Sequence, residues 1–239
     1  MLHAFPFSNR LWDFLPPPPG FKHNQPKFPG FGDSKVWPSA TLKSAAQALA
    51  IHLDELGVHK SMILGGISMG GYWAMEFLRE FPQRAEGLFL ISTKATLDSA
   101  EALQQRLLTA DRVEKEGCGF LSESMVPKLL GKTTLENNPA LARDVARWIL
   151  EAPPGAVASA QRAMASRREQ MDLMAALKVP TWVLAGDEDA IIPLSESENL
   201  SKTVPGCHLE PFKGVGHLIP LEDPEKFEEK LNAFLRIIP

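Results

Sequence analysis

The sequence predicts an α/β fold in which helices cover a mostly parallel sheet. Short apolar runs that suit buried strands alternate with segments that repeat apolar residues at helical spacing. The runs lie at residues 61–64, 87–92 and 180–186, with a weaker candidate at 207–212. The helical patterns lie at residues 39–56, 71–81 and 223–237. Strands that alternate with helices in this order predict a parallel sheet.

Local chemistry sets the boundaries of these elements. Gly57 ends the first helix, because glycine readily adopts the left-handed conformation of a helix cap. Pro82 closes the helix over 71–81, since proline cannot continue a helix. The runs 87–92 and 180–186 are continuously apolar, as expected for strands that are buried on both faces.

A long helical insertion separates the strands that end near Ser92 and begin near Pro180. Helical patterns fill it at residues 99–115, 121–130, 139–151 and 154–168. A regular crossover between parallel strands is much shorter, so we expect a lid over the carboxyl ends of the strands, where α/β sheets bind ligands. This divides the chain into a first core part (1–93), a helical lid (94–178) and a second core part (179–239).

Composition excludes several classes of function. The chain has 239 residues and a net charge of −4, which suits one globular domain and offers no basic surface for nucleic acid. No apolar stretch reaches the length of a membrane span and no signal peptide is evident, so we expect a cytoplasmic protein without a membrane partner. Cys118 and Cys207 have no metal-ligand spacing, and we expect free thiols, no metal site and no cofactor.

Ser68 lies in the sequence Gly66-Ile67-Ser68-Met69-Gly70, between a predicted strand and a predicted helix. A sharp turn at this point exposes the serine hydroxyl and places it near a helix N-terminus, which favours developing negative charge. The two glycines are expected because flanking backbone segments approach closely in such a turn. Ser68 is therefore the candidate nucleophile.

A serine nucleophile needs a base and an orienting acid, which we expect in loops after later strands. His217 follows the candidate strand 207–212 and is the candidate base. The loop after the strand 180–186 offers three carboxylates, Asp187, Glu188 and Asp189. The order of serine, acid and histidine along the chain is that of α/β-hydrolases.

These segments resemble the α/β-hydrolase superfamily over nearly the whole chain. In that superfamily the acid usually stands three residues after the glycine that ends the strand, which selects Asp189; Asp187, Glu188 and Asp98 remain alternatives. The resemblance implies an oxyanion hole formed by the backbone N–H groups of Phe5 and Met69. Ala4 stands where relatives usually carry glycine, which restricts the loop.

Within the superfamily, scattered residues of the insertion resemble the enol-lactonase and esterase branch, whose best-known members act on 3-oxoadipate enol-lactone. The resemblance implies a serine hydrolase that cleaves a small carboxylic ester or lactone through an acyl-enzyme. Alternatives are a non-catalytic protein that binds a small ligand, and a thioester hydrolase, carbon–carbon bond hydrolase or perhydrolase with the same triad. We expect a monomer or homodimer. Residues that could line the substrate pocket, or simply form core, are Trp12, Phe120, Met125, Trp148, Met164, Ile191 and Leu218.

The N-terminal region departs from the family pattern. Relatives begin with a β-hairpin before the oxyanion-hole loop, whereas this sequence starts with that loop. We therefore expect about six strands, with the polar, proline-containing segment 21–28 as an edge strand. His3 is expected to make a structural hydrogen bond within its own loop, and Arg167 and Arg168 to form a solvated helix end.

Overall fold

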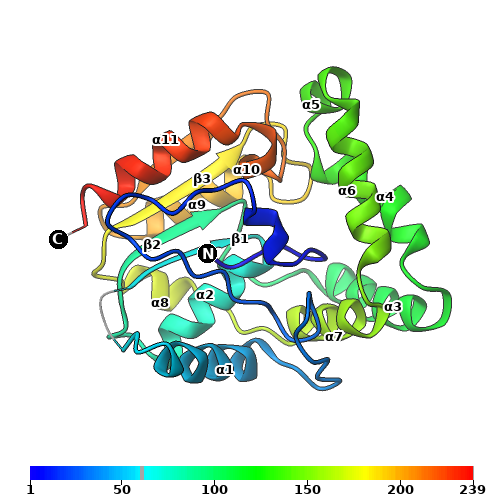
Figure 1. Ribbon diagram of the computed structural model, residues 1–239, viewed down its shortest axis with the longest axis horizontal. Helices are drawn as coiled ribbons and strands as arrows, with labels where there is room; N and C mark the ends of the chain where they lie inside the picture. The colour runs from blue at the N-terminus through cyan, green and yellow to red at the C-terminus, as the bar shows by residue number, and fades with distance from the viewer. Residues whose placement is uncertain (60–61, 239) are drawn as a thin grey trace.

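The computed structural model describes residues 1–59 and 62–238. Its centre is a parallel sheet of four strands in the order β1-β2-β3-β4 (Figure 1). The strands are β1 (Met62–Ile67), β2 (Ala85–Ile91), β3 (Thr181–Gly186) and β4 (His208–Phe212). The predicted α/β fold with a parallel sheet is confirmed. Ser61, the first residue of the predicted strand 61–64, lies outside the described residues.

The predicted count of about six strands is wrong for the part of the chain that the structure describes. Leu2 joins β1 only through an isolated bridge, in which its N–H donates to Gly65 O (2.7 Å) and its carbonyl accepts from Ile67 N (3.2 Å). The segment 21–28 forms no strand. Its polar residues and Pro26 do not suit a ladder, and it meets Met1 through one hydrogen bond from the Met1 nitrogen to Asn24 O (2.7 Å).

Helices cover both faces of the sheet. Helix α11 (Pro224–Leu235) lies on one side and α1 (Leu42–Glu55) and α2 (Met69–Glu80) on the other (Figure 1). On the α11 side, Phe89 of β2 packs its ring 5.1 Å from that of Phe234 and 6.1 Å from that of Phe227. These side chains are fully buried, so apolar burial joins α11 to the sheet.

The predicted insertion consists of helices between β2 and β3. They are α3 (Ala100–Glu116), α4 (Gly119–Leu129), α5 (Lys132–Asn137), α6 (Pro139–Glu151), α7 (Pro154–Ala165) and α8 (Met171–Ala175). Helices α3 to α6 gather beyond one end of the sheet (Figure 1). The remaining helices are a 3-10 turn (Asn9–Trp12), α9 (Leu194–Thr203) and α10 (Ile219–Glu222). None of the described helices combines the length and apolar character needed to cross a bilayer.

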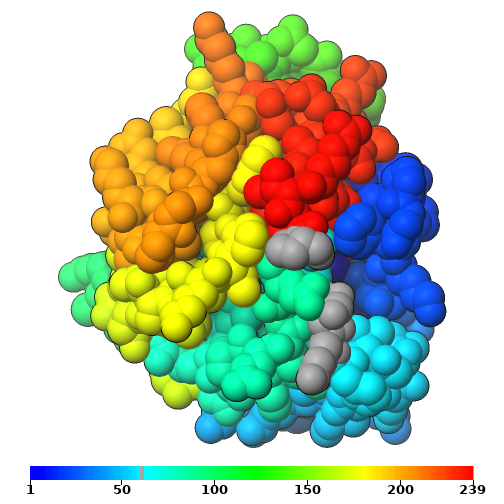
Figure 2. Space-filling view, turned by 90° about the vertical axis from the view of Figure 1, so that its left-hand side faces the viewer, coloured from blue at the N-terminus to red at the C-terminus, as the bar shows by residue number. Residues whose placement is uncertain are grey.

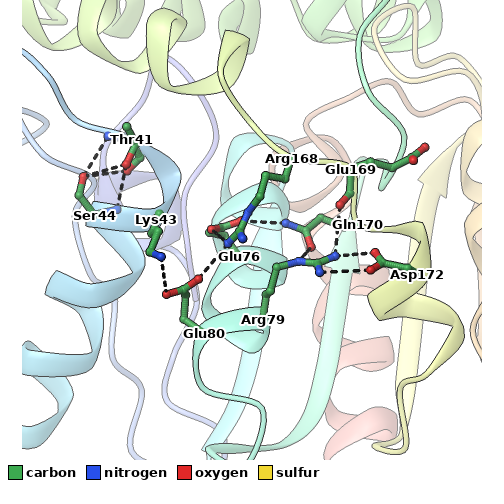
Figure 3. A network of polar contacts seen from close by, with 10 residues as sticks. All are labelled: Thr41, Lys43, Ser44, Glu76, Arg79, Glu80, Arg168, Glu169, Gln170 and Asp172. Atoms are coloured by element: carbon green, nitrogen blue, oxygen red, sulfur yellow. Dashed lines mark hydrogen bonds and ion pairs between the residues drawn. The ribbon is translucent and has the colours of Figure 1, made fainter.

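The end of the insertion is tied to α2 by a polar network (Figure 3). The carboxylate of Glu76, which is 2% exposed, accepts hydrogen bonds from Arg168 and from Gln170 Nε2 (2.8 Å). Arg79 donates to Gln170 Oε1 (2.7 Å) and pairs with Asp172 (2.5 Å). Because each buried polar atom here has a partner, the network fixes the segment 168–172 against the helix that follows the candidate nucleophile.

A groove of about 520 Å³ lies where the N-terminal segment, α1 and α11 meet, on the face shown in Figure 2. Its lining includes Lys22, Asn24, Leu53, Met62 and Leu235. A second groove of about 360 Å³ lies against α1 and α2 and is lined in part by Trp37, His52 and Trp73. Neither groove is lined by any residue of the predicted triad.

Candidate active site

Ser68 lies between β1 and α2 with φ 54° and ψ −116°. This positive φ is in the left-handed region, which residues other than glycine rarely adopt. Several hydrogen bonds hold it there. Its N–H donates to Ile91 O (2.9 Å), and its carbonyl accepts from Gly71 N (2.9 Å) and Thr93 Oγ1 (2.9 Å). The turn predicted from the sequence is thus present, and neighbouring strand ends and helix residues over-determine its backbone.

The two glycines of the turn are required by close backbone approach. A β-carbon added at Gly66 would overlap the carbonyl of Gly70. One added at Gly70 would overlap the carbonyl of Leu2 and lie 2.9 Å from that of His3. Gly70 therefore brings the loop that contains Phe5 against the first turn of α2, because only glycine leaves room for the two backbones.

Asp189 and His217 form a buried pair. His217 Nδ1 lies 2.7 Å from Asp189 Oδ2, and the side chains are 1% and 2% exposed, respectively. The other carboxylate oxygen, Oδ1, accepts hydrogen bonds from Ile191 N (2.8 Å) and Ile192 N (2.9 Å). With both oxygens engaged, the carboxylate is fixed in one orientation toward the imidazole, and Nδ1 of His217 carries the proton that it donates.

The other carboxylates considered for the acid have different partners. Asp187 accepts from Gly214 N (2.7 Å), and Glu188 accepts from Thr133 N and Oγ1 (both 2.7 Å). Asp98 pairs with Arg106 (2.7 Å) and with Arg167 (3.0 Å). In the part of the chain that the structure describes, only Asp189 among these four is hydrogen-bonded to His217.

The predicted oxyanion donors stand on two backbone segments. Met69 is the first residue of α2, and its N–H is one of the groups without a partner inside the helix. Phe5 follows Ala4 in the N-terminal loop, and no hydrogen bond among residues 1–59 and 62–238 uses the N–H of Phe5 or Met69. Both N–H groups are therefore available to donate hydrogen bonds to an anionic ligand atom.

His3 fixes this loop. Its ring bonds Ala4 O through Nδ1 (3.0 Å) and accepts Phe28 N–H at Nε2 (3.0 Å), so that the neutral ring satisfies both partners. Burial lowers the pKa of His3 to about 4, against a smaller opposite effect of the hydrogen bond to Ala4. The expected structural hydrogen bond within the loop is present.

The residues suggested for the substrate pocket are spread over several elements. Phe120 and Met125 lie on α4, Trp148 on α6 and Met164 on α7, whereas Ile191 and Leu218 lie in the loops of the candidate acid and the candidate base. Trp148 contacts Phe7 edge-on (6.2 Å between ring centres), which joins the lid to the N-terminal loop. Trp12 is fully buried and stacks on Phe227 of α11, so its contacts support a core role.

The solvated helix end expected for Arg167 and Arg168 is wrong for Arg167, whereas the Arg168 side chain is 49% exposed. The Arg167 side chain is 3% exposed, donates to Thr96 O (2.6 Å) and stands 4.5 Å from the centre of the Tyr72 ring. Arg168 bonds Glu76 and Glu80 (Figure 3). Both guanidinium groups have acidic partners that are distant in sequence, but only that of Arg167 is buried.

Sequence reasoning missed Glu222, the last residue of α10, which accepts hydrogen bonds from backbone groups on both sides of His217. They come from Gly216 N (3.0 Å) and Leu218 N (3.0 Å). A carboxylate five residues after the candidate base in a short turn was the available signal. Its other donors come from the distant lid, which no local pattern reveals.

These loops lie at the carboxyl ends of parallel strands, as in the class of α/β enzymes that build the site from loops at one edge of the sheet. The chain belongs to the alpha/beta hydrolase fold family, whose sequence model matches residues 1–224. This confirms the resemblance that was predicted from the turn at Ser68 and from the loops that contain Asp189 and His217.

Relatives include esterases, lipases and lactonases. A solved thermophilic esterase from Thermogutta terrifontis, described as malate bound, is 38% identical with a TM-score of 0.95, and the match covers 99% of this chain and 88% of that chain. Lipase 1 of Psychrobacter immobilis is 26% identical over 89% of this chain and 68% of its own length. 3-Oxoadipate enol-lactonase 2 of Acinetobacter baylyi is 22% identical over 77% of this chain and 67% of its own length.

Proposed function

We propose that the chain is a serine hydrolase that cleaves a small carboxylic ester or lactone. The observation that carries the proposal is the buried pair of His217 and Asp189, 2.7 Å apart, in a fold whose strained turn presents Ser68. The likeness to the Thermogutta terrifontis esterase, at 38% identity and over 99% of the chain, supports the choice of an ester as substrate. The enol-lactonase relative supports a cyclic ester as an alternative form of the same bond.

In the proposed reaction each of these groups has one role. Ser68 Oγ attacks the acyl carbon while His217 Nε2 takes its proton, and Asp189 holds the Nδ1–H tautomer and stabilises the resulting imidazolium. The N–H groups of Met69 and Phe5 bind the oxyanion. His217 then protonates the leaving alkoxide. Water attacks the acyl-enzyme by the reverse sequence and releases the acid and Ser68.

Two further readings use the same site. The triad also suits thioester hydrolysis, perhydrolysis and carbon–carbon bond hydrolysis, which differ in the leaving group or the attacking molecule. A non-catalytic ligand-binding role has less support, since binding alone does not require a buried acid–histidine pair. The cytoplasmic location and the monomeric or dimeric state stay predictions.

The test combines turnover with covalent trapping. We expect hydrolysis of short p-nitrophenyl esters and labelling of Ser68 by a fluorophosphonate probe, read by intact mass and peptide mapping. Ser68→Ala should abolish both. Ser92→Ala is the matched control, because Ser92 is also a serine with positive φ at the end of a strand, and this variant should still be labelled. Labelling that persists in Ser68→Ala, or ligand binding without turnover across esters and lactones, would overturn the proposal.

A further inference from the structure

Glu222 collects four hydrogen bonds from two regions that are far apart in sequence. Its Oε2 atom accepts from Gly216 N (3.0 Å), Gly131 N (2.8 Å) and Thr134 Oγ1 (2.7 Å). Its Oε1 atom accepts from Leu218 N (3.0 Å). An ionised carboxylate can only accept hydrogen bonds, so it suits a site where all four neighbouring groups donate.

Two of these donors stand immediately before and after His217. The N–H groups of His217 (3.1 Å) and Leu218 (3.2 Å) also donate to the carbonyl oxygen of Leu129, which is the last residue of α4. Three consecutive N–H groups of the loop thus have acceptors outside it, from Gly216 to Leu218. The backbone that carries the imidazole is therefore fixed independently of the imidazole's own bond to Asp189.

The junction between α4 and α5, residues 129–134, also reaches the acid loop. Thr133 donates to Glu188 through its N–H and its hydroxyl, both at 2.7 Å, and Glu188 immediately precedes Asp189. A β-carbon added at Gly131 would lie 2.8 Å from Gly216 N and 2.8 Å from the Glu188 carboxylate. One short segment of the lid thus touches the loops of both the acid and the base.

We propose that Glu222 is a positioning residue. Its hydrogen bonds hold the loop of His217 against the junction 129–134 of the lid and so fix the position of the imidazole. The proposal rests on the proposed function, since positioning matters only if His217 transfers protons. In this proposal Glu222 acts through the backbone of the loop and not on the substrate. Its removal takes the acceptor from Gly216 N–H in the loop and from Gly131 N–H in the junction, and the loop relaxes toward water. A displacement of the base by about 1 Å lowers the rate by about 100-fold.

The first test is kinetic and uses an isosteric variant. Glu222→Gln keeps an acceptor oxygen for one group of donors but presents an NH₂ group to the other. We expect kcat to fall by about 10- to 100-fold while KM stays within about twofold of the parent value. In Glu222→Ala we expect a larger loss of kcat. Glu76→Gln is the matched control, because Glu76 is a buried carboxylate whose hydrogen bonds come from Arg168 and Gln170, outside the loop of His217.

The control separates positioning from stability. Glu76→Gln should lower Tm as much as Glu222→Gln does, with kcat within about threefold of the parent, because its network supports α2 and not the base. The proposal is overturned if the two variants lose kcat equally at matched Tm. If Glu222→Ala does not fold, the comparison of the two glutamine variants decides.

A second readout does not depend on hydrolysis. The proton between His217 Nδ1 and Asp189 gives a low-field NMR signal, which His217→Gln assigns by its loss. In Glu222→Gln we expect this proton to exchange with water at least about tenfold faster, since the loop opens more often. Unchanged exchange together with unchanged kcat overturns the proposal. Absence of ester turnover in the parent protein overturns the proposed function instead, and the exchange rate still decides whether Glu222 positions the ring.

Discussion

Asp189 bonds His217 through one carboxylate oxygen and the start of the loop that leads to α9 through the other. Oδ2 lies 2.7 Å from His217 Nδ1, and Oδ1 accepts the N–H groups of Ile191 and Ile192 at 2.8 and 2.9 Å. The backbone bonds orient the carboxylate whether or not the histidine is present. This division of the two oxygens determines what a substitution at Asp189 does.

Asp189→Asn should inactivate the protein without unfolding it. The asparagine oxygen keeps both backbone bonds, so its NH₂ group faces His217 Nδ1, which must then accept, and Nε2 carries the proton. A base in that tautomer cannot take the serine proton, and we expect kcat to fall by about 10³- to 10⁴-fold. Ester hydrolysis and a urea titration measure the two effects. Asp187→Asn should retain activity within about threefold, because the Asp187 carboxylate accepts from Gly214 N and not from His217 in the described part of the chain. A larger loss there than at Asp189 would contradict the assignment.

Gly131→Ala should strain the lid junction. The new β-carbon would lie 2.8 Å from Gly216 N and 3.1 Å from Val215 C, where backbone must shift. We expect a loss of about 1–3 kcal/mol in the free energy of unfolding, measured by urea titration, together with a lower kcat. Gly119→Ala is the matched control in the same lid, because no atom lies within 4 Å of its added β-carbon. Equal effects of the two changes would refute the contact argument.

Asp98 should make stability depend on pH. Burial raises its pKa, but the hydrogen bond from Arg106 and the charges of Arg106, Arg167 and Lys94 outweigh it and bring the pKa to about 2, from 3.8. A depressed carboxylate pKa stabilises the fold above the unfolded value and loses this effect as pH falls toward the folded value. Asp98→Asn should therefore be about 2 kcal/mol less stable than the parent at pH 6, with about half of that difference lost by pH 3. A difference that does not change between these pH values would be inconsistent with this ion-pair cluster.

A matched control for that comparison is Asp33→Asn. Asp33 pairs with Lys27 at 2.6 Å but its side chain is 82% exposed. Solvent screens such a pair, so the substitution should leave the free energy of unfolding nearly unchanged at both pH values.

His3 should give a pH dependence in a different range. Its pKa is about 4, lowered from 6.5 by burial, so the fold favours the neutral ring. Stability is complete above pH 6.5 and is lost as pH falls through 4, with a decrease of about 3 kcal/mol between pH 7 and pH 4. Chemical denaturation of the parent and of His3→Gln at the two pH values measures this. The decrease should be about 3 kcal/mol smaller in His3→Gln than in the parent, and equal decreases in the two proteins would show that other groups cause it.

Elements that depend on a short local sequence pattern were predictable from the sequence. The glycines around Ser68, the apolar runs and the lid helices each depend on a few neighbouring residues, and the structure contains them. The structure of the segment 21–28 was not predictable. Its departure from a strand depends on how little of the N-terminal segment pairs with β1, where Leu2 alone among the described residues forms a bridge. Pairing is a property of two segments, and the sequence shows each one alone.

The candidate site follows the same rule. The loops of His217 and of the three carboxylates were found from order and spacing, but the contact that distinguishes Asp189 lies in three dimensions. Glu222 escaped notice because half of its donors, Gly131 and Thr134, come from the lid. Likewise, Arg167 was expected in water, because Asp98 and Tyr72, which enclose it, lie far away in sequence.

The junction 129–134 has a consequence for exchanging lids between relatives. A chimera that replaces the whole insertion also replaces the acceptor at Leu129 and the donors at Gly131 and Thr133, which the acid and base loops use. Such a hybrid would lose contacts that support the pair of Asp189 and His217. Grafts that retain residues 129–134 and exchange only the surrounding helices keep that support, so the useful crossover points lie inside the lid and not at its ends.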